Sequence, residues 1–137
     1  MRKLMWRTNR SFLLVIGAAV LCFSGGCGGP AARGDLKLRH VLLIEFDKTT
    51  TQEQIKQTEK MFCEMARGIE EVEDFEWGTD VSGGERTKGF THCFILTFAN
   101  EAGLERYQAN AAHDELRTAT RPYIKKMLAF DYWKQKD

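Results

Sequence analysis

The chain has 137 residues, enough for one domain, and its formal net charge of +1 conceals an uneven distribution. Four of its 20 basic residues and none of its 19 acidic residues precede Cys27, so the remainder carries 16 basic against 19 acidic side chains, a net charge of −3. A mildly acidic domain without a basic stripe lacks the electrostatic footprint of a nucleic-acid-binding protein, so we exclude that class of partner.

Residues 1–26 have the layout of a secretory signal. A basic segment, 1–10, precedes an apolar segment, 11–23, that is shorter than the roughly 20 residues needed to span a bilayer. Ser24-Gly-Gly then leads to Cys27, and a cysteine after two glycines resembles the lipobox of bacterial lipoproteins, where it is diacylated. Because Ser24 stands where a lipobox usually has leucine, an ordinary cleaved signal and an uncleaved anchor remain alternatives.

Acylation of Cys27 would attach the protein stably to a membrane, because two or more acyl chains supply the required transfer free energy. Residues 27–35 contain several glycines and are predicted to form a flexible tether, and 134–137 a short tail. We therefore expect a protein of the bacterial cell envelope, anchored by lipid and facing the periplasm or the exterior.

Residues 36–133 are predicted to form one domain of alternating strands and helices. In chain order we first expect a strand at 36–46 and a helix that begins at the capping box Thr50-Thr-Gln-Glu53 and ends near Gly68. Strands at 72–81 and 90–98 follow, joined by a glycine-bearing turn. Helical segments capped by Asn100 and Asn110 come next, and after Pro122 we expect a strand at 123–133. The order β-α-β-β-α-β is the ferredoxin-like arrangement, an α+β fold.

The segment 90–98 contains no charged residue and is typical of a strand buried on both faces. In the ferredoxin-like order it lies beside the first strand in the middle of the sheet. Helices cover only one face of such a sheet, so the other apolar face needs a partner. We therefore predict a homodimer in which two sheets pack face to face as a closed barrel.

Cys63 and Cys93 each sit in an apolar pattern, and we expect two free buried thiols rather than a disulfide, although an exported protein would permit one. No Cys-x-x-Cys spacing is present. The acidic run at 70–76 alternates with aromatic residues at strand spacing, which indicates a solvated edge. We expect neither a metal site nor a cofactor.

His40 and His92 occupy equivalent places in the first and third strands. If these strands were parallel neighbours in matching register, the two imidazoles would lie side by side on one face. The alternative is that both are core histidines, hydrogen-bonded to each other or to the backbone.

Four segments of the domain resemble the stress-responsive A/B barrel (Dabb) family. They come in the family's order and spacing, and they are Arg39-His-Val-Leu-Leu-Ile-Glu-Phe46, Gly89-Phe-Thr-His-Cys-Phe-Ile-Leu-Thr-Phe98, Tyr107-Gln-Ala-Asn-Ala-Ala-His113 and Leu128-Ala-Phe-Asp-Tyr132. The resemblance implies the dimeric α/β barrel for 36–133. It implies less about activity, because one fold hosts unrelated functions.

A plant polyketide cyclase branch of this family performs an intramolecular aldol condensation without metal or cofactor. The resemblance implies that His113 is a general base, that Tyr107 helps to orient it, and that His40 and His92 lie near the pocket. The family often has His-Pro before its Ala-His pair. Here Asn110-Ala111 stand instead, which is expected to loosen the start of that helical segment and shift His113.

Three hypotheses about function follow. The first is a binding or stress-related barrel with a pocket for a small apolar ligand and no turnover. The second is a cofactor-independent cyclase or lyase that uses His113 and Tyr107. The third is a haem-degrading or quinol-type monooxygenase with His113 as the helix-borne axial ligand. The alternative to all of these chemical roles is that His113 caps or hydrogen-bonds its own segment while Tyr107 fills the core.

Overall fold

The computed structural model describes residues 36–136. The predicted signal, the predicted acylation site Cys27 and the tether before Leu36 lie outside this range. Within the described range, no helix is both long and apolar enough to cross a membrane.

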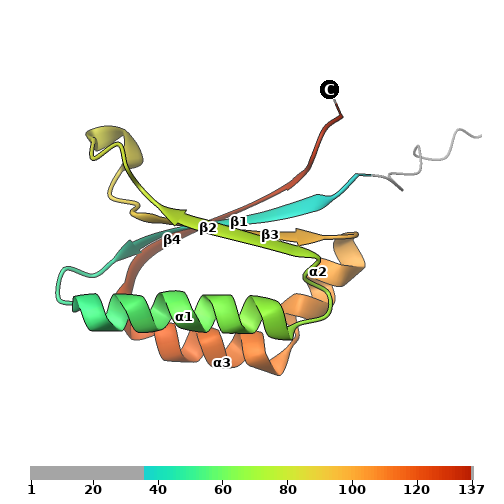
Figure 1. The fold of residues 1–137 in the computed structure, drawn as a ribbon, viewed down its shortest axis with the longest axis horizontal. Coiled ribbons are helices and arrows are strands. Elements are labelled where there is room, and N and C mark those ends of the chain that lie inside the picture. The colour runs from blue at the N-terminus through green and yellow to red at the C-terminus, as the bar shows by residue number, and fades with distance from the viewer. Residues whose placement is uncertain (1–35, 137) are drawn as a thin grey trace, which may run out of the picture. The chain divides into compact units, whose positions relative to one another are not determined.

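The domain is a four-stranded antiparallel sheet with helices packed on one of its faces (Figure 1). Its elements in chain order are β1 (Leu38–Phe46), α1 (Gln52–Gly68), β2 (Asp74–Thr79), the 3-10 turn η1 (Glu85–Thr87), β3 (His92–Phe98), α2 (Glu101–Gln108), α3 (Ala111–Thr120), η2 (Arg121–Tyr123) and β4 (Ile124–Trp133). The strand order is β2-β3-β1-β4. This is the ferredoxin-like α+β fold, as the order of the predicted elements indicated.

The helix boundaries follow local capping chemistry. Asn100 and Asn110 cap α2 and α3, as predicted, by accepting hydrogen bonds from the backbone N–H groups of Gly103 and Ala112, each at 2.9 Å. The capping box of α1 lies one residue later than predicted, because Thr51 and Gln54 exchange the two bonds. The hydroxyl of Thr50 instead donates to the carbonyl oxygen of Tyr123 at 3.1 Å.

The prediction that His40 and His92 lie side by side is wrong. β1 and β3 are antiparallel, so His40 pairs with Leu96 and His92 pairs with Ile44, toward opposite ends of the two strands. The reason is topological: β2 and β3 run in opposite directions, and β3 lies between β2 and β1 in the sheet. Both imidazoles do share the helix-covered face.

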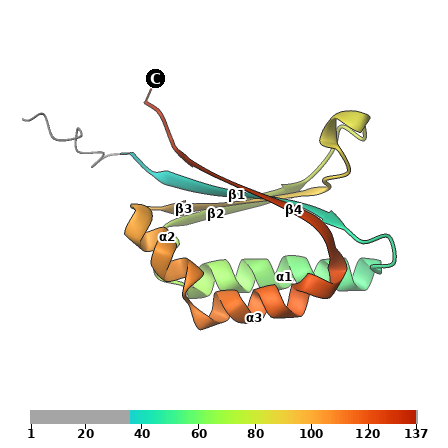
Figure 2. The same ribbon diagram turned by 180° about the vertical axis from the view of Figure 1, so that it is seen from behind.

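The two faces of the sheet differ in what covers them. Side chains at alternate positions of β1 and β3 are buried beneath α1 and α3, and the stacking of Phe62 on Phe94, with ring centroids 4.1 Å apart, marks the centre of this core. No α-helix of the described chain lies on the opposite face, as the two views show (Figure 2). This open face, defined by its apolar residues, consists of Val41, Leu43, Cys93, Ile95, Leu128 and Phe130.

A β-bulge interrupts the pairing of β4 with β1. Glu45 lies opposite Lys126 and Phe46 lies opposite Ile124, so Lys125 is an extra residue on β4. A bulge of this kind bends its strand and redirects neighbouring side chains. It occurs where β4 follows η2, next to the start of α1 and the end of α3 (Figure 2).

Cys63 and Cys93 are both free and half-buried. Burial raises the pKa of the Cys93 thiol above its ordinary value, with a smaller contribution from the nearby Glu76 carboxylate. Cys93 therefore behaves as a small apolar side chain rather than as a reactive thiolate.

Candidate active site

A cavity of about 350 Å³ lies on the helix side of the sheet, beneath the start of β4. This volume is within the range of small-molecule sites. Its apolar lining comes from β1, α1, α3 and β4, and consists of Leu42, Phe62, Leu116, Ile124 and Met127. Its polar lining consists of Tyr107, His113, Thr120, Arg117, Arg121, Lys125 and Lys126.

Tyr107 of α2 is fully buried and lines this cavity. Its ring packs against Phe98 and His40, with centroid separations of 5.1 Å and 5.9 Å. Its hydroxyl has no hydrogen-bond partner among the described residues. A buried unpaired hydroxyl costs about 1–3 kcal/mol. Burial also raises the pKa of the phenol far above its usual value, so the group stays protonated and remains a hydrogen-bond donor.

His113 lies in the first turn of α3, half-buried at the same cavity. Its Nδ1 is 3.2 Å from the carbonyl oxygen of Gln108. Because a carbonyl only accepts, Nδ1 carries the hydrogen and Nε2 keeps a free lone pair. Burial lowers the pKa of His113, and the charges of Arg117 and His40 act in the same direction, while the Gln108 hydrogen bond opposes them. The ring is therefore neutral at pH 7 and basic at Nε2.

The structure brings Tyr107 and His113 together although they belong to different helices. Their ring centroids are 4.5 Å apart. The connection is a single turn in which the N–H of Asn110 bonds to the carbonyl of Tyr107 and the Asn110 side chain caps α3. The asparagine cap starts α3 directly at Ala111, so the absence of His-Pro does not unravel this helical start.

His40 lies behind Tyr107 and not on the cavity wall. It is buried, its Nδ1 is 2.5 Å from Oδ1 of Asp131 on β4, and its ring meets Tyr107 edge-on. A carboxylate accepts hydrogen bonds, so Nδ1 of His40 is the donor. The partner of His40 is thus a neighbouring strand's carboxylate, not His92 or the backbone.

His92 lies away from His40 in the sheet register and lines a different cavity, of about 450 Å³, together with the turn that follows β2. Its Nε2 is 3.0 Å from Glu59 of α1, and its Nδ1 is 2.8 Å from the hydroxyl of Thr91. The imidazole therefore joins α1 to β3 through side-chain partners, rather than through His40 or the backbone as the structural alternative expected.

Four basic residues of the cavity lining were missed by the sequence reasoning. All four are exposed at the cavity, and we name them the cationic rim: Arg117, Arg121, Lys125 and Lys126. A signal for them exists in the sequence, because residues 116–130 contain these four cations and no acidic residue. Within a domain of net negative charge, this segment is a local exception.

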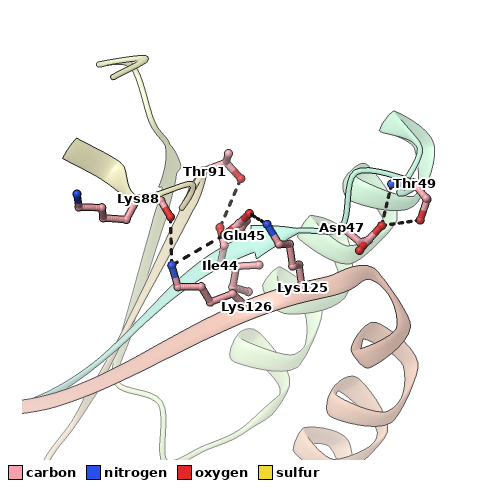
Figure 3. A network of polar contacts seen from close by, with 8 residues as sticks. All are labelled: Ile44, Glu45, Asp47, Thr49, Lys88, Thr91, Lys125 and Lys126. Atoms are coloured by element: carbon pink, nitrogen blue, oxygen red, sulfur yellow. Dashed lines mark hydrogen bonds and ion pairs between the residues drawn. The ribbon is translucent and has the colours of Figure 1, made fainter. Parts of the chain in front are cut away.

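Two members of the cationic rim are already held by the protein (Figure 3). Lys125 Nζ is 2.5 Å from Oε1 of Glu45, and Lys126 Nζ bonds to the carbonyl oxygen of Lys88 at 3.1 Å and lies over the ring of Phe90. The Lys125 contact joins β4 to β1, and the Lys126 contact with Lys88 joins β4 to the segment that enters β3 (Figure 3). Arg117 has only Asp114, at 4.0 Å, and no partner is found for Arg121 within residues 36–136.

No group of three or more His, Cys, Asp or Glu residues in the described part of the chain is placed to hold a metal ion. The side chains that line the cavity offer proton transfer and hydrogen bonding, by Tyr107 and His113, between apolar walls and arginine side chains.

Residues 38–134 match the Stress responsive A/B Barrel Domain (Dabb) family. The chain belongs to this family. It is 35% identical over 101 residues to the stress-response A/B barrel domain-containing protein HS1 of Arabidopsis thaliana, a match that covers 74% of this chain and 91% of that protein. It is 26% identical over 101 residues to olivetolic acid cyclase of Cannabis sativa, covering 74% of this chain and all of the cyclase (100%).

Two solved structures of other proteins have the same fold. The hydroxynitrile lyase from Passiflora edulis superimposes with a TM-score of 0.68 at 22% identity, over 74% of this chain and 95% of the lyase. A dimeric ferredoxin-like protein from Thermobifida fusca gives a TM-score of 0.63 at 18% identity, over 71% and 90% of the two chains.

Proposed function

We propose that this Dabb protein is a cofactor-independent enzyme of the cyclase or lyase type, which removes a proton next to a carbonyl group of a small, largely apolar ligand. The observation that carries the proposal is the pairing of a neutral, half-buried His113 with the unpartnered hydroxyl of Tyr107 at one cavity. A cyclase and a lyase among the relatives support it.

The proposed step divides the work between the two side chains. Nε2 of His113 takes a proton from the carbon next to the carbonyl, and the electron pair of that C–H bond moves into the carbonyl to form an enolate. The hydroxyl of Tyr107 donates a hydrogen bond to the enolate oxygen. The enolate carbon then attacks a second carbonyl, and His113 returns its proton to the new alkoxide. Read in reverse, the same steps cleave a carbon–carbon bond.

The test is exchange of carbon-bound hydrogen in deuterated water, with methyl hexyl ketone as a neutral apolar probe and proton NMR as the readout. The wild-type chain is expected to accelerate loss of the signals next to the carbonyl. His113→Ala is expected to abolish the acceleration, and Tyr107→Phe to reduce it by about 10²-fold or more, the usual cost of one oxyanion donor. Lys60→Ala, on the exposed face of α1, serves as the control. A folded His113→Ala variant with undiminished exchange would refute the proposal.

We further propose that two copies associate through the open face. Leu128 and Phe130 are 43% and 59% exposed there, and they continue an apolar surface across β1 and β3. The dimeric relative from Thermobifida fusca supports this assembly. Light scattering is expected to give a dimer for the wild-type chain and a monomer for Phe130→Glu. Val81→Glu, an equally apolar but fully exposed loop position, should leave the dimer intact.

The envelope location stays a proposal that rests on residues 1–27 alone. Metabolic labelling of the expressed chain with a radioactive fatty acid is expected to mark the wild type and not Cys27→Ser. Labelling that persists in Cys27→Ser would contradict acylation at this position.

A further inference from the structure

We infer that the cavity ligand carries an anionic group, a carboxylate or a phosphate, at one end of an apolar chain, and that Arg117 and Arg121 bind this group. The inference rests on the proposed function for the location of the site and adds the chemical class of the ligand. It follows from how charge is distributed around the cavity.

The cavity combines an apolar interior with an excess of positive charge. Its lining contains four cationic side chains and no carboxylate. The two acidic residues that contact the rim are Glu45, which holds Lys125, and Asp114, which lies 4.0 Å from Arg117. Neither Glu45 nor Asp114 lines the cavity, so all the charged side chains that line it are cationic ones.

The two arginines are the members of the rim left for a ligand. Lys125 and Lys126 are engaged with Glu45, the carbonyl of Lys88 and the ring of Phe90. Arg117 and Arg121 lie one helical turn apart, from α3 into η2, so their side chains project from neighbouring positions. Arginine is the side chain best suited to a carboxylate or phosphate, because its planar guanidinium donates two parallel hydrogen bonds.

The position of the arginines also agrees with the proposed chemistry. Arg117 lowers the pKa of His113 through its charge, so the two side chains lie close in space. An anionic end held at Arg117 and Arg121 would leave the apolar chain to fill the space between Leu42, Phe62 and Met127. The ligand would therefore be anchored at one end while another part of it lies against Tyr107 and His113.

Calorimetric titration of the full chain with octanoate, octyl phosphate and octanol tests the inference, since the probes share one chain and differ in the head group. The expected result is that octanoate or octyl phosphate binds at least tenfold more tightly than octanol, and the tighter of the two identifies the head group. Arg121→Gln is expected to weaken anion binding about tenfold, as loss of a charge-assisted hydrogen bond does, and to leave octanol unaffected.

Two variants make the result specific. Arg121→Lys keeps the charge and is expected to recover part of the affinity, whereas Arg67→Gln, at the end of α1 and outside the cavity lining, should change nothing. Equal binding of octanoate, octyl phosphate and octanol, binding of none of them, or anion binding that ignores Arg121→Gln would each overturn the inference. The wild-type chain separates this inference from the proposed function, because a wild type that binds the anions but shows no exchange activity refutes only the catalysis.

Discussion

The rings of His113 of α3 and Tyr107 of α2 pack together with centroids 4.5 Å apart, and burial shifts their pKa values in opposite directions. Burial lowers the pKa of the imidazole, which keeps it neutral and basic, and raises the pKa of the phenol, which keeps it protonated. One cavity thus holds a proton acceptor beside a hydrogen-bond donor.

Replacement of Tyr107 by phenylalanine is expected to separate stability from activity. The hydroxyl has no partner among the described residues, so its removal relieves an unpaired buried group and should raise the free energy of unfolding by about 1 kcal/mol. Exchange activity should fall at the same time. Urea denaturation measures the first effect and NMR the second. Tyr132→Phe, at a half-exposed position of β4, should alter neither. A substantial loss of stability in Tyr107→Phe would show that the hydroxyl has a partner in solution.

The pH dependence of stability should reveal His113. Its pKa in the folded protein lies below the ordinary value of 6.5, so below pH 6.5 the unfolded chain binds a proton that the folded chain does not. The contribution of His113 is therefore fully present above pH 6.5 and is lost as the pH falls toward its folded pKa. Urea denaturation across this interval is expected to show a smaller loss of stability for His113→Gln than for the wild type.

The same titration should govern activity. Because only the neutral imidazole accepts a proton, the exchange rate is expected to be independent of pH above 6.5 and to fall below it. Proton–nitrogen NMR of the imidazole identifies the titrating ring. An activity profile with its midpoint above pH 6.5 would contradict the assignment of His113 as base, since the pKa is shifted downward.

The cap at Asn110 is expected to matter more for the site than for the fold. Asn110→Ala removes the hydrogen bond to Ala112 and should cost about 1 kcal/mol of stability. Thr51→Ala removes the equivalent bond at α1 and should cost a similar amount. Only Asn110→Ala should reduce exchange activity, because His113 lies in the first turn of the helix that Asn110 caps. Equal activity losses in the two variants would show that lost stability, not misplacement of His113, is the cause.

Gly89 is expected to be the least replaceable glycine of the turn into β3. Its φ of +90° lies outside the range that side chains favour, and a Cβ there would approach Oε2 of Glu45 to 2.7 Å. Gly89→Ala should therefore cost roughly 1–3 kcal/mol. Gly84→Ala is the matched control, because φ there is −114° and the nearest atom is 3.9 Å away. Thermal unfolding of both variants provides the comparison, and equal stabilities would show that Gly89 is not strained.

The fold was predictable because local and global signals agree in this chain. The alternation of apolar residues in β1 and β3, the caps at Asn100 and Asn110 and the end of α1 at Gly68 each appear in the sequence and in the structure. Each depends on residues within one element. The one-residue error at the capping box arose because Thr50 and Thr51 are equally good caps by type, and tertiary contact of Thr50 with Tyr123 decides between them.

The site was less predictable because it depends on relations between elements. The meeting of Tyr107 and His113 is set by the turn between α2 and α3, and the strand direction assumed for His40 and His92 was wrong. Asp131 was placed correctly on the face of β4 that alternates with Leu128 and Phe130, but nothing in the sequence pairs it with His40. The cationic rim combines α3, η2 and β4, so a search within single elements does not find it.

The bulge at Lys125 has a consequence for how this cavity can change in evolution. Ile124 and Met127 are three positions apart, and in a regular strand they would project to opposite sides of the sheet. The extra residue between them returns both to the same side, where they line the cavity together. Deletion of Lys125 would place the side chains of Ile124 and Met127 on opposite sides of the sheet. Point substitutions can change the volume of the cavity gradually, whereas the loss of a single codon here would change the residues that line it in one step.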